Sequence, residues 1–262
     1  MNMYEPIEPV LLPGERSFEL TQPDGSQVRG YFHDTSNGPV GVFVHGFRSQ
    51  CNGEKSMAFA RHAREQGWSW LRFDMRGHGL SDGALEKQYI SDALADLQAV
   101  FSFTAERPLI LLASSMGGWI SLLAALRAPA RVMGIVMIAP AFNFIQQNFG
   151  NLPADILAVW ERNGTMNFPD AYGGEPYTVE FPIIEDARPY DVLASPVEID
   201  MPLHIIHGDK DVVVPLASTQ LFISNARADG LVLEVVPGGD HRLTDHIPLI
   251  TRHLDRVWQE IQ

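Results

Sequence analysis

A serine stands at the end of an apolar run, in a pattern that suits a nucleophile. Ser115 has Ala113 two positions before it and Gly117 two positions after it, and a stretch rich in leucine and alanine follows. This order predicts a strand, a sharp turn and a helix. A serine on such a turn needs small neighbours two positions away, because bulk there would collide with nearby backbone. The pattern therefore favours Ser115 over Ser114, whose neighbours at that spacing are a leucine and a methionine.

A second apolar run ends in a turn that can supply a backbone amide. It closes with His45, Gly46 and Phe47. Glycine lets the chain double back so that the next amide faces the serine turn, and the helix after Ser115 offers the amide of Met116. We expect the N–H groups of Phe47 and Met116 to form an oxyanion hole that stabilises developing negative charge. His45 itself is expected to be a structural hydrogen-bonding group rather than a base.

A nucleophilic serine also needs a base and an acid that orients the base. When the serine lies on a strand-to-helix turn, the acid and then the histidine follow it along the chain. His241 lies in a glycine-rich loop after the last apolar run, where an imidazole can reach the serine. Asp209 and Asp211 both follow the apolar run before that, and the residues alone leave both open as the acid. His253, in the helix that follows, is expected at the surface.

Short apolar segments alternate with amphipathic ones from about residue 40 onward, which predicts a mostly parallel, doubly wound α/β sheet with crossover helices. The expected strands cover residues 40–45, 68–74, 109–114, 132–139, 203–207 and 231–236. Apolar spacing predicts helices over residues 89–106 and at the C-terminus. Residues 17–20 and 27–32 flank an Asp-Gly pair, which predicts an N-terminal antiparallel hairpin.

The stretch from about residue 142 to residue 198 breaks this alternation. It is rich in Asn, Pro, Gly and aromatic residues and contains one expected helix at 154–162. Ligands bind beyond the carboxyl ends of parallel strands, so an insertion here is well placed to cover a site. We expect one domain over residues 1–262, with a small lid formed by residues 142–198. Phe142, Phe144 and Phe149 are candidates for lining an acyl pocket.

Composition excludes several other classes of function. The chain has 262 residues, and 19 Lys and Arg against 32 Asp and Glu give a net charge of −13. This charge repels nucleic acid, and no apolar run approaches the roughly 18 residues that span a membrane. Cys51 is the single cysteine, which excludes an internal disulfide. Residues 1–14 lack the basic and apolar regions of a signal peptide, so we expect a cytoplasmic protein.

Together these motifs resemble a serine hydrolase of the α/β-hydrolase superfamily over nearly the whole chain. The motifs are His45-Gly46-Phe47, Asp74 to Ser81, Ala113-Ser-Ser115-Met-Gly117, His207 to Asp211, and Gly239-Asp-His241. The resemblance implies that the acid lies three residues after the glycine of the fourth motif, which is Asp211, with Asp209 as the alternative. It implies an α/β-hydrolase fold and catalysis by Ser115, Asp211 and His241 without a metal or an organic cofactor.

A narrower resemblance is to the mitochondrial acyl-protein thioesterase (depalmitoylase) family, whose members also hydrolyse acyl glucuronides. It rests on Ser-Ser115-Met-Gly-Gly-Trp119, on Leu152-Pro153 and Trp160 in the insertion, and on Asp240-His241-Arg242. The sequence lacks that family's transit peptide, so the resemblance implies a related catalytic core and not the same location.

These observations predict a serine hydrolase that cleaves a small-molecule carboxylic ester or thioester through an acyl-enzyme intermediate. Because fold and triad do not set the substrate, a C–C bond hydrolase and a peptidase are alternatives with the same residues. A non-catalytic ligand-binding protein that retains the fold is an alternative from another class. The insertion carries few cations, so strongly anionic leaving groups such as CoA are not expected.

Overall fold

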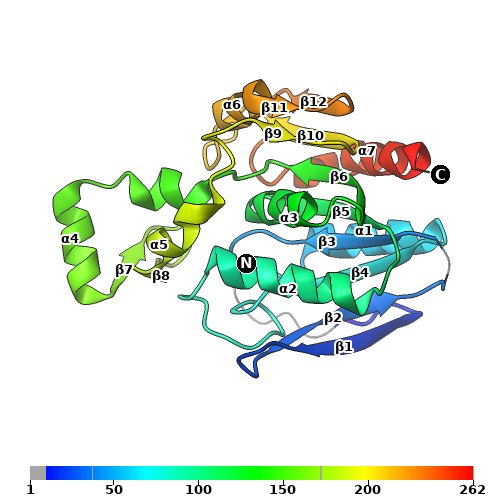
Figure 1. Cartoon of the computed structure of the whole chain (residues 1–262), viewed down its shortest axis with the longest axis horizontal. Coiled ribbons are helices and arrows are strands. Elements are labelled where there is room, and N and C mark those ends of the chain that lie inside the picture. The colour runs from blue at the N-terminus through cyan, green and yellow to red at the C-terminus, as the bar shows by residue number, and fades with distance from the viewer. Residues whose placement is uncertain (1–9, 37, 172, 262) are drawn as a thin grey trace.

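The computed structural model describes residues 10–36, 38–171 and 173–261, and an eight-stranded sheet lies at its centre (Figure 1). The strands of this sheet are β1 (Glu15–Thr21), β2 (Gln27–His33), β3 (Val40–Val44), β4 (Ser69–Asp74), β5 (Leu109–Ser114), β6 (Val132–Ile138), β10 (Leu203–Gly208) and β12 (Leu231–Val236). Their order is β1-β2-β4-β3-β5-β6-β10-β12. β2 pairs antiparallel with β1 and β4, whereas the other pairings are parallel. The expected mostly parallel sheet with an N-terminal antiparallel hairpin is confirmed.

Helices cover both faces of this sheet. They are α1 (Glu54–Glu65), α2 (Ile90–Phe103), α3 (Met116–Arg127), α6 (Leu216–Asn225), the short η3 (Thr244–His246) and α7 (Ile247–Glu260). α1 and α7 contribute to the hydrophobic core on one face, and α2, α3 and α6 contribute to the core on the other. β3 and β5 are buried along their whole length, because helices lie over both of their faces.

The last helix shows how apolar spacing determines packing. Ile250, Leu254 and Trp258 of α7 lie on one face of the helix and are buried. His253 was expected at the surface, but it is 2% exposed. Its Nδ1 atom lies 3.0 Å from Nδ1 of His204 in β10. The expectation is wrong because the buried face of α7 is wide enough to include His253.

Most of residues 142–198 form a small substructure that projects past the carboxyl end of β6, and the range ends with β9 (Val197–Glu198) beside β10 and β11 (Ala226–Arg227) (Figure 1). The range also contains η1 (Gln146–Gly150), α4 (Ala154–Asn163), β7 (Thr165–Phe168), β8 (Tyr177–Glu180), α5 (Ile183–Ala187) and η2 (Arg188–Tyr190). β7 and β8 pair as an antiparallel hairpin, and β9 pairs with β11. Secondary structure in this insertion is therefore more extensive than the one helix that the sequence predicts.

Side chains on both sides of the boundary bond the insertion to two helices that cover the sheet, α2 and α3. The carboxylate of Asp186 accepts hydrogen bonds from the backbone amides of Ile90 and Ser91 at the start of α2. A carboxylate is stabilised there by the unpaired amides and the positive end of the helix dipole. In α3, Trp119 donates its indole N–H to the carbonyl of Tyr190 at 3.0 Å. The insertion is thus held against α2 and α3.

Three further findings apply to the described residues. No helix among them is long and apolar enough to cross a bilayer. No group of three or more His, Cys, Asp and Glu side chains among them is arranged to hold a metal ion. Residues 1–9, which make up most of the segment considered for a signal peptide, lie outside the described ranges.

Candidate active site

Ser115 lies at the turn between β5 and α3, where the backbone takes an unusual conformation. Its φ of 55° is in the left-handed region, which costs about 1–3 kcal/mol for a residue other than glycine. A Cβ atom added to Gly117 would lie 2.3 Å from the carbonyl oxygen of Val44. A Cβ atom added to Gly118 would lie 2.8 Å from Cβ of Pro140. Glycine is therefore required at these two positions so that α3 can approach the end of β3 and the segment after β6.

The structure brings three of the expected residues into one hydrogen-bonded row. His241 Nε2 lies 3.0 Å from Ser115 Oγ, and His241 Nδ1 lies 2.7 Å from Asp211 Oδ2. With Nδ1–H donating to the carboxylate, Nε2 carries a lone pair that can accept the serine proton. Each of the three follows the carboxyl end of a parallel strand, which is why residues distant in sequence meet here.

The two alternative residues make other contacts. Asp209 is exposed and accepts the backbone N–H of Gly238 at 2.6 Å. Ser114 accepts a hydrogen bond from the ammonium group of Lys55 at 3.0 Å. The structure therefore joins the three favoured residues and leaves both alternatives outside the row.

Asp211 is held in its ionised form by several donors. Burial alone would raise the pKa of its carboxyl, but hydrogen bonds from His207 and His241 bring that pKa well below its usual range. His207 Nε2 lies 3.2 Å from Asp211 Oδ2, and the amides of Val213 and Val214 donate to Oδ1 at 2.9 and 2.8 Å. Sequence reasoning assigned no role to His207. Its position four residues before Asp211 is the signal that points to it.

The turn after β3 packs directly against the serine. A Cβ atom added to Gly46 would lie 2.9 Å from Cβ of Ser115, so this approach requires glycine. The amide of Phe47 follows in this turn, and the amide of Met116 begins α3. Among the described residues, no protein group accepts a hydrogen bond from either amide. Neither N–H group is therefore bonded within the described part of the chain, as is required of an oxyanion-hole donor.

Two buried histidines hold this turn. His78 Nε2 accepts the backbone N–H of Arg48 at 3.1 Å, and His45 Nε2 accepts that of Met75 at 3.0 Å. Burial lowers the pKa of both imidazoles, which keeps these nitrogens unprotonated and able to accept. His45 and His78, which come from two separate motifs, thus both help to fix the backbone around Phe47.

The insertion contacts the same turn. The ring of Phe47 lies 5.3 Å from that of Phe144 and 5.4 Å from that of Tyr177, measured between centroids. Arg48, the next residue, pairs with Asp170 at 2.8 Å and lies 4.2 Å from the centroid of the Tyr177 ring. Aromatic and ionic contacts therefore connect the insertion to the segment that carries the Phe47 amide.

The three phenylalanines considered for an acyl pocket have different surroundings. Phe144 contacts the turn described above. Phe142 is fully buried and stacks on Phe222 of α6 with centroids 4.1 Å apart. Phe149 is 2% exposed, and its ring lies 4.6 Å from that of Phe168. The expectation that Phe142 and Phe149 line a pocket is wrong, because both belong to the packed core.

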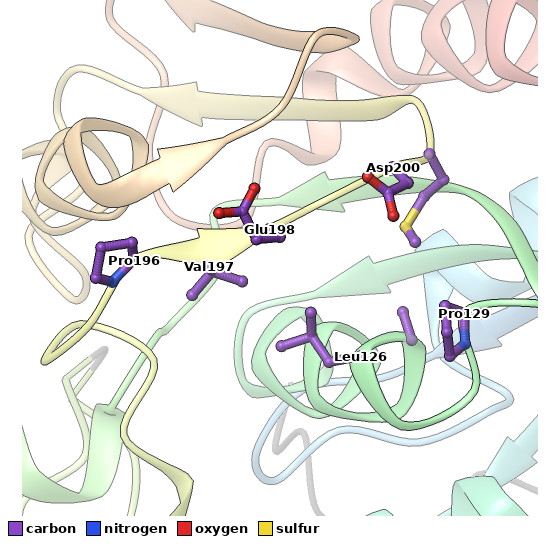
Figure 2. A pocket seen from close by; sticks show the side chains of 8 residues that line it. Leu126, Pro129, Pro196, Val197, Glu198 and Asp200 are labelled. Atoms are coloured by element: carbon purple, nitrogen blue, oxygen red, sulfur yellow. The ribbon is translucent and has the colours of Figure 1, made fainter.

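A pocket of about 370 Å³ lies in another part of the molecule, between α3 and β9 (Figure 2). Apolar side chains and two carboxylates line it, from Ala125, Leu126, Pro129, Pro196, Val197, Glu198, Asp200 and Met201. None of the residues in contact with Ser115 is among them. This pocket is separate from the candidate active site.

Comparison with known proteins agrees with the fold and the motifs. Residues 38–179 match the family model described as serine aminopeptidase, S33. The chain is 29% identical to the mitochondrial palmitoyl-protein thioesterase of Homo sapiens, over 78% of this chain and 67% of that protein. A putative hydrolase from Agrobacterium vitis S4 superposes with a TM-score of 0.87 and 29% identity, over 95% of this chain and 98% of that one. Alpha/beta hydrolase domain-containing protein 10 from mouse superposes with a TM-score of 0.86 and 25% identity, over 94% of this chain and 100% of the mouse chain.

These comparisons confirm the expected α/β-hydrolase fold and the resemblance to acyl-protein thioesterases, but they correct the expected location. The expectation of a cytoplasmic protein is wrong, because the thioesterase relatives are mitochondrial proteins. An acidic charge and a single cysteine fit any reducing compartment. They therefore do not separate the cytoplasm from the mitochondrion.

Proposed function

The chain belongs to the serine aminopeptidase S33 family of α/β hydrolases, and on that premise we propose that it cleaves carboxylic esters or thioesters through an acyl-enzyme on Ser115. Family membership supports hydrolase activity in general. The observation that carries the finer proposal is the hydrogen-bonded row from Ser115 through His241 to Asp211. The row has the order and donor pattern that serine acyl transfer needs.

In the first half of the reaction, Ser115 Oγ attacks the acyl carbon of the substrate. His241 Nε2 removes the hydroxyl proton as the new C–O bond forms, and the ionised Asp211 stabilises the resulting imidazolium. The amides of Phe47 and Met116 donate to the oxyanion of the tetrahedral intermediate. The imidazolium then gives its proton to the leaving alcohol or thiol, and the original ester or thioester bond breaks.

In the second half, water attacks the acyl-enzyme. His241 removes one proton from the water molecule, and the same oxyanion hole holds the second tetrahedral intermediate. The proton returns to Ser115 Oγ as the acyl–Ser115 bond breaks, which releases the carboxylic acid. The protein ends in its starting protonation state.

The groups around the oxyanion turn favour an apolar acyl group. The rings of Phe144 and Tyr177 each contact the ring of Phe47, the residue whose amide would hold the acyl oxygen. Apolar surface of this kind binds a methylene chain through burial. The human relative bears the name palmitoyl-protein thioesterase, which supports an acyl substrate for this chain. We propose that residues 142–198 act as the lid over that acyl group.

A fluorophosphonate probe, which reacts with activated serines, tests the proposal. Wild-type protein should be labelled and should hydrolyse p-nitrophenyl butyrate, and Ser115→Ala should lose both properties. Ser114→Ala is the matched control, and it should still be labelled. Labelling of Ser115→Ala, or a folded wild type that is neither labelled nor active, would contradict the proposal and favour a ligand-binding protein.

Substrate panels separate ester or thioester cleavage from the alternatives. Acyl thioesters, p-nitrophenyl esters, acyl glucuronides and aminoacyl p-nitroanilides should be compared at equal concentration. Turnover of the anilides alone would favour a peptidase, in keeping with the name of the family model. Turnover of the esters or thioesters supports the proposal.

A further inference from the structure

The ammonium group of Lys55 links a residue next to Ser115 to a residue next to His241. Lys55 is the second residue of α1, and its Nζ atom donates to Ser114 Oγ at 3.0 Å and to the carbonyl oxygen of Arg242 at 2.8 Å. Ser114 directly precedes Ser115, and Arg242 directly follows His241. One side chain from a third element thus spans the end of β5 and the loop after β12.

The surroundings of this ammonium group make it costly to bury. Burial lowers the pKa of Lys55 to about 8, and the carboxylates of Asp240, Asp211 and Glu54 oppose that shift. The guanidinium of Arg242 adds to it. A methionine would fill a similar volume without the desolvation cost. The two hydrogen bonds to Ser114 and Arg242 are therefore the property that a lysine adds at this position.

The loop that Lys55 contacts is also bonded to the turn after β10. The carbonyl of Gly239 accepts the backbone N–H of Lys210 at 2.9 Å, and Asp209 accepts that of Gly238 at 2.6 Å. The carboxylate of Asp240 accepts the backbone N–H groups of Arg242 and Leu243 at 3.0 and 2.9 Å, which closes a tight turn within the loop itself. These contacts determine the shape of the loop and its place beside β10. The Lys55 ammonium group, bonded to Ser114 at the end of β5 and to Arg242 in the loop, adds a direct link between the loop and β5.

We propose that Lys55 is a positioning residue that holds the His241 loop at the distance from β5 at which His241 Nε2 can take the Ser115 proton. The inference rests on the function proposed above. A displacement of about 1 Å at a reacting group can cost on the order of 100-fold in rate. Because Lys55 does not touch the acyl group, its loss should slow the proton transfer and leave substrate binding unchanged.

The test compares Lys55→Met with Lys87→Met, which removes the same ammonium group from an exposed site. The Lys87 ammonium lies 3.9 Å from Glu180, and the side chain is 56% exposed. Lys55→Met should lower kcat for p-nitrophenyl butyrate by about 10- to 100-fold with KM within about twofold, and should slow phosphonylation of Ser115 by a similar factor. Lys87→Met should match wild type. Circular dichroism checks that both variants are folded.

A double-variant cycle distinguishes positioning from a general loss of stability. Ser114→Ala should lower kcat modestly, and Ser114→Ala/Lys55→Met should be no slower than Lys55→Met alone, because Ser114 acts through the same ammonium group. Should Lys55→Met fail to fold, Lys55→Gln replaces it, with the same losses expected. Wild-type kcat in the Lys55 variant, a rise in KM as the main effect, or fully additive losses overturn the inference. Fluorophosphonate labelling of wild type and Ser115→Ala in the same experiment tests the proposed function separately. The proposed function holds if wild type is labelled and Ser115→Ala is not.

Discussion

At the scale of single residues, Asp211 and Asp209 are a matched pair of carboxylates in different surroundings. Asp211 lies 2.7 Å from His241 Nδ1, whereas Asp209 bonds the amide of Gly238. We expect Asp211→Asn to lower kcat by about 10⁴-fold, because an amide favours the wrong imidazole tautomer. Asp209→Asn should change kcat by no more than about twofold, as for other surface substitutions. Ester hydrolysis by the two purified variants measures this, and similar losses in both would show that neither acid orients His241.

The pKa of Lys55 leads to a second prediction at this scale, on how the free energy of unfolding changes with pH. Its pKa is about 8 in the folded protein against an ordinary value of 10.5, so between these values the unfolded chain binds more protons. The free energy of unfolding of wild type should therefore rise, relative to Lys55→Met, as the pH increases from about 8 to about 10.5. We expect a relative gain of about 1–2 kcal/mol, less than the full pKa shift implies, because Lys55 is partly exposed and solvent reduces the effect. Urea unfolding of both proteins at several pH values measures it; a relative loss over that range would contradict it.

The residues of the proposed catalytic triad could be predicted from the sequence, but the residues that contact and position them were not predicted. Ser115 and His241 carry local signals, namely small neighbours and a glycine-rich loop, and the family resemblance singled out Asp211. His207 lies four residues before Asp211, a local signal that sequence reasoning did not use. Lys55 carries no such signal, because its role depends on contacts that only the fold creates. Lys55 lies 59 and 187 residues from its two hydrogen-bond partners.

At the scale of elements, the 142–198 insertion should determine the acyl group. Each methylene buried against Phe47, Phe144 and Tyr177 is worth about 0.8 kcal/mol, which would raise kcat/KM by about fourfold until the apolar surface is covered. We expect kcat/KM to rise and then level off over p-nitrophenyl esters of two to sixteen carbons. Phe144→Ala should flatten the rise, whereas Leu126→Ala, in the separate pocket of Figure 2, should not. A flat profile for wild type would show that the aromatic residues serve only to hold the insertion in place.

Elements with a clear apolar rhythm were predictable, and those without it were not. The strands from β3 to β12 in the main sheet and helices α2, α4 and α7 follow the expected segments, because strongly apolar residues recur at a regular spacing. The buried residues of α1 include two large apolar side chains, Met57 and Phe59, and the rest are small, so the apolar pattern of this helix is weak in sequence. The strands β7 and β8 have four residues each, too few for an alternating apolar pattern to be distinctive. Such elements are determined by the tertiary packing around them.

At the scale of the whole molecule, the net charge of −13 should select against anionic substrates. Residues 142–198 contain nine acidic residues and two basic ones. Several of these acids are already bonded, such as Asp170 to Arg48 and Asp186 to the start of α2. The excess of negative charge nevertheless remains, on the segment that we propose as the lid over the site.

This charge gives a prediction that salt can test. An acyl-CoA brings several negative charges, so its encounter with the site should be slow at low ionic strength and faster when salt screens the repulsion. Between about 20 mM and about 500 mM NaCl, we expect kcat/KM for butyryl-CoA to rise on the order of 10-fold. For p-nitrophenyl butyrate, which has the same acyl group and no charge, kcat/KM should stay within about twofold because it lacks the Coulomb contribution. Dividing the kcat/KM of butyryl-CoA by that of p-nitrophenyl butyrate cancels any effect of salt on the steps that the two substrates share. A fall of the butyryl-CoA value with salt would mean instead that a local cationic group attracts the leaving group, and that net charge does not govern substrate choice here.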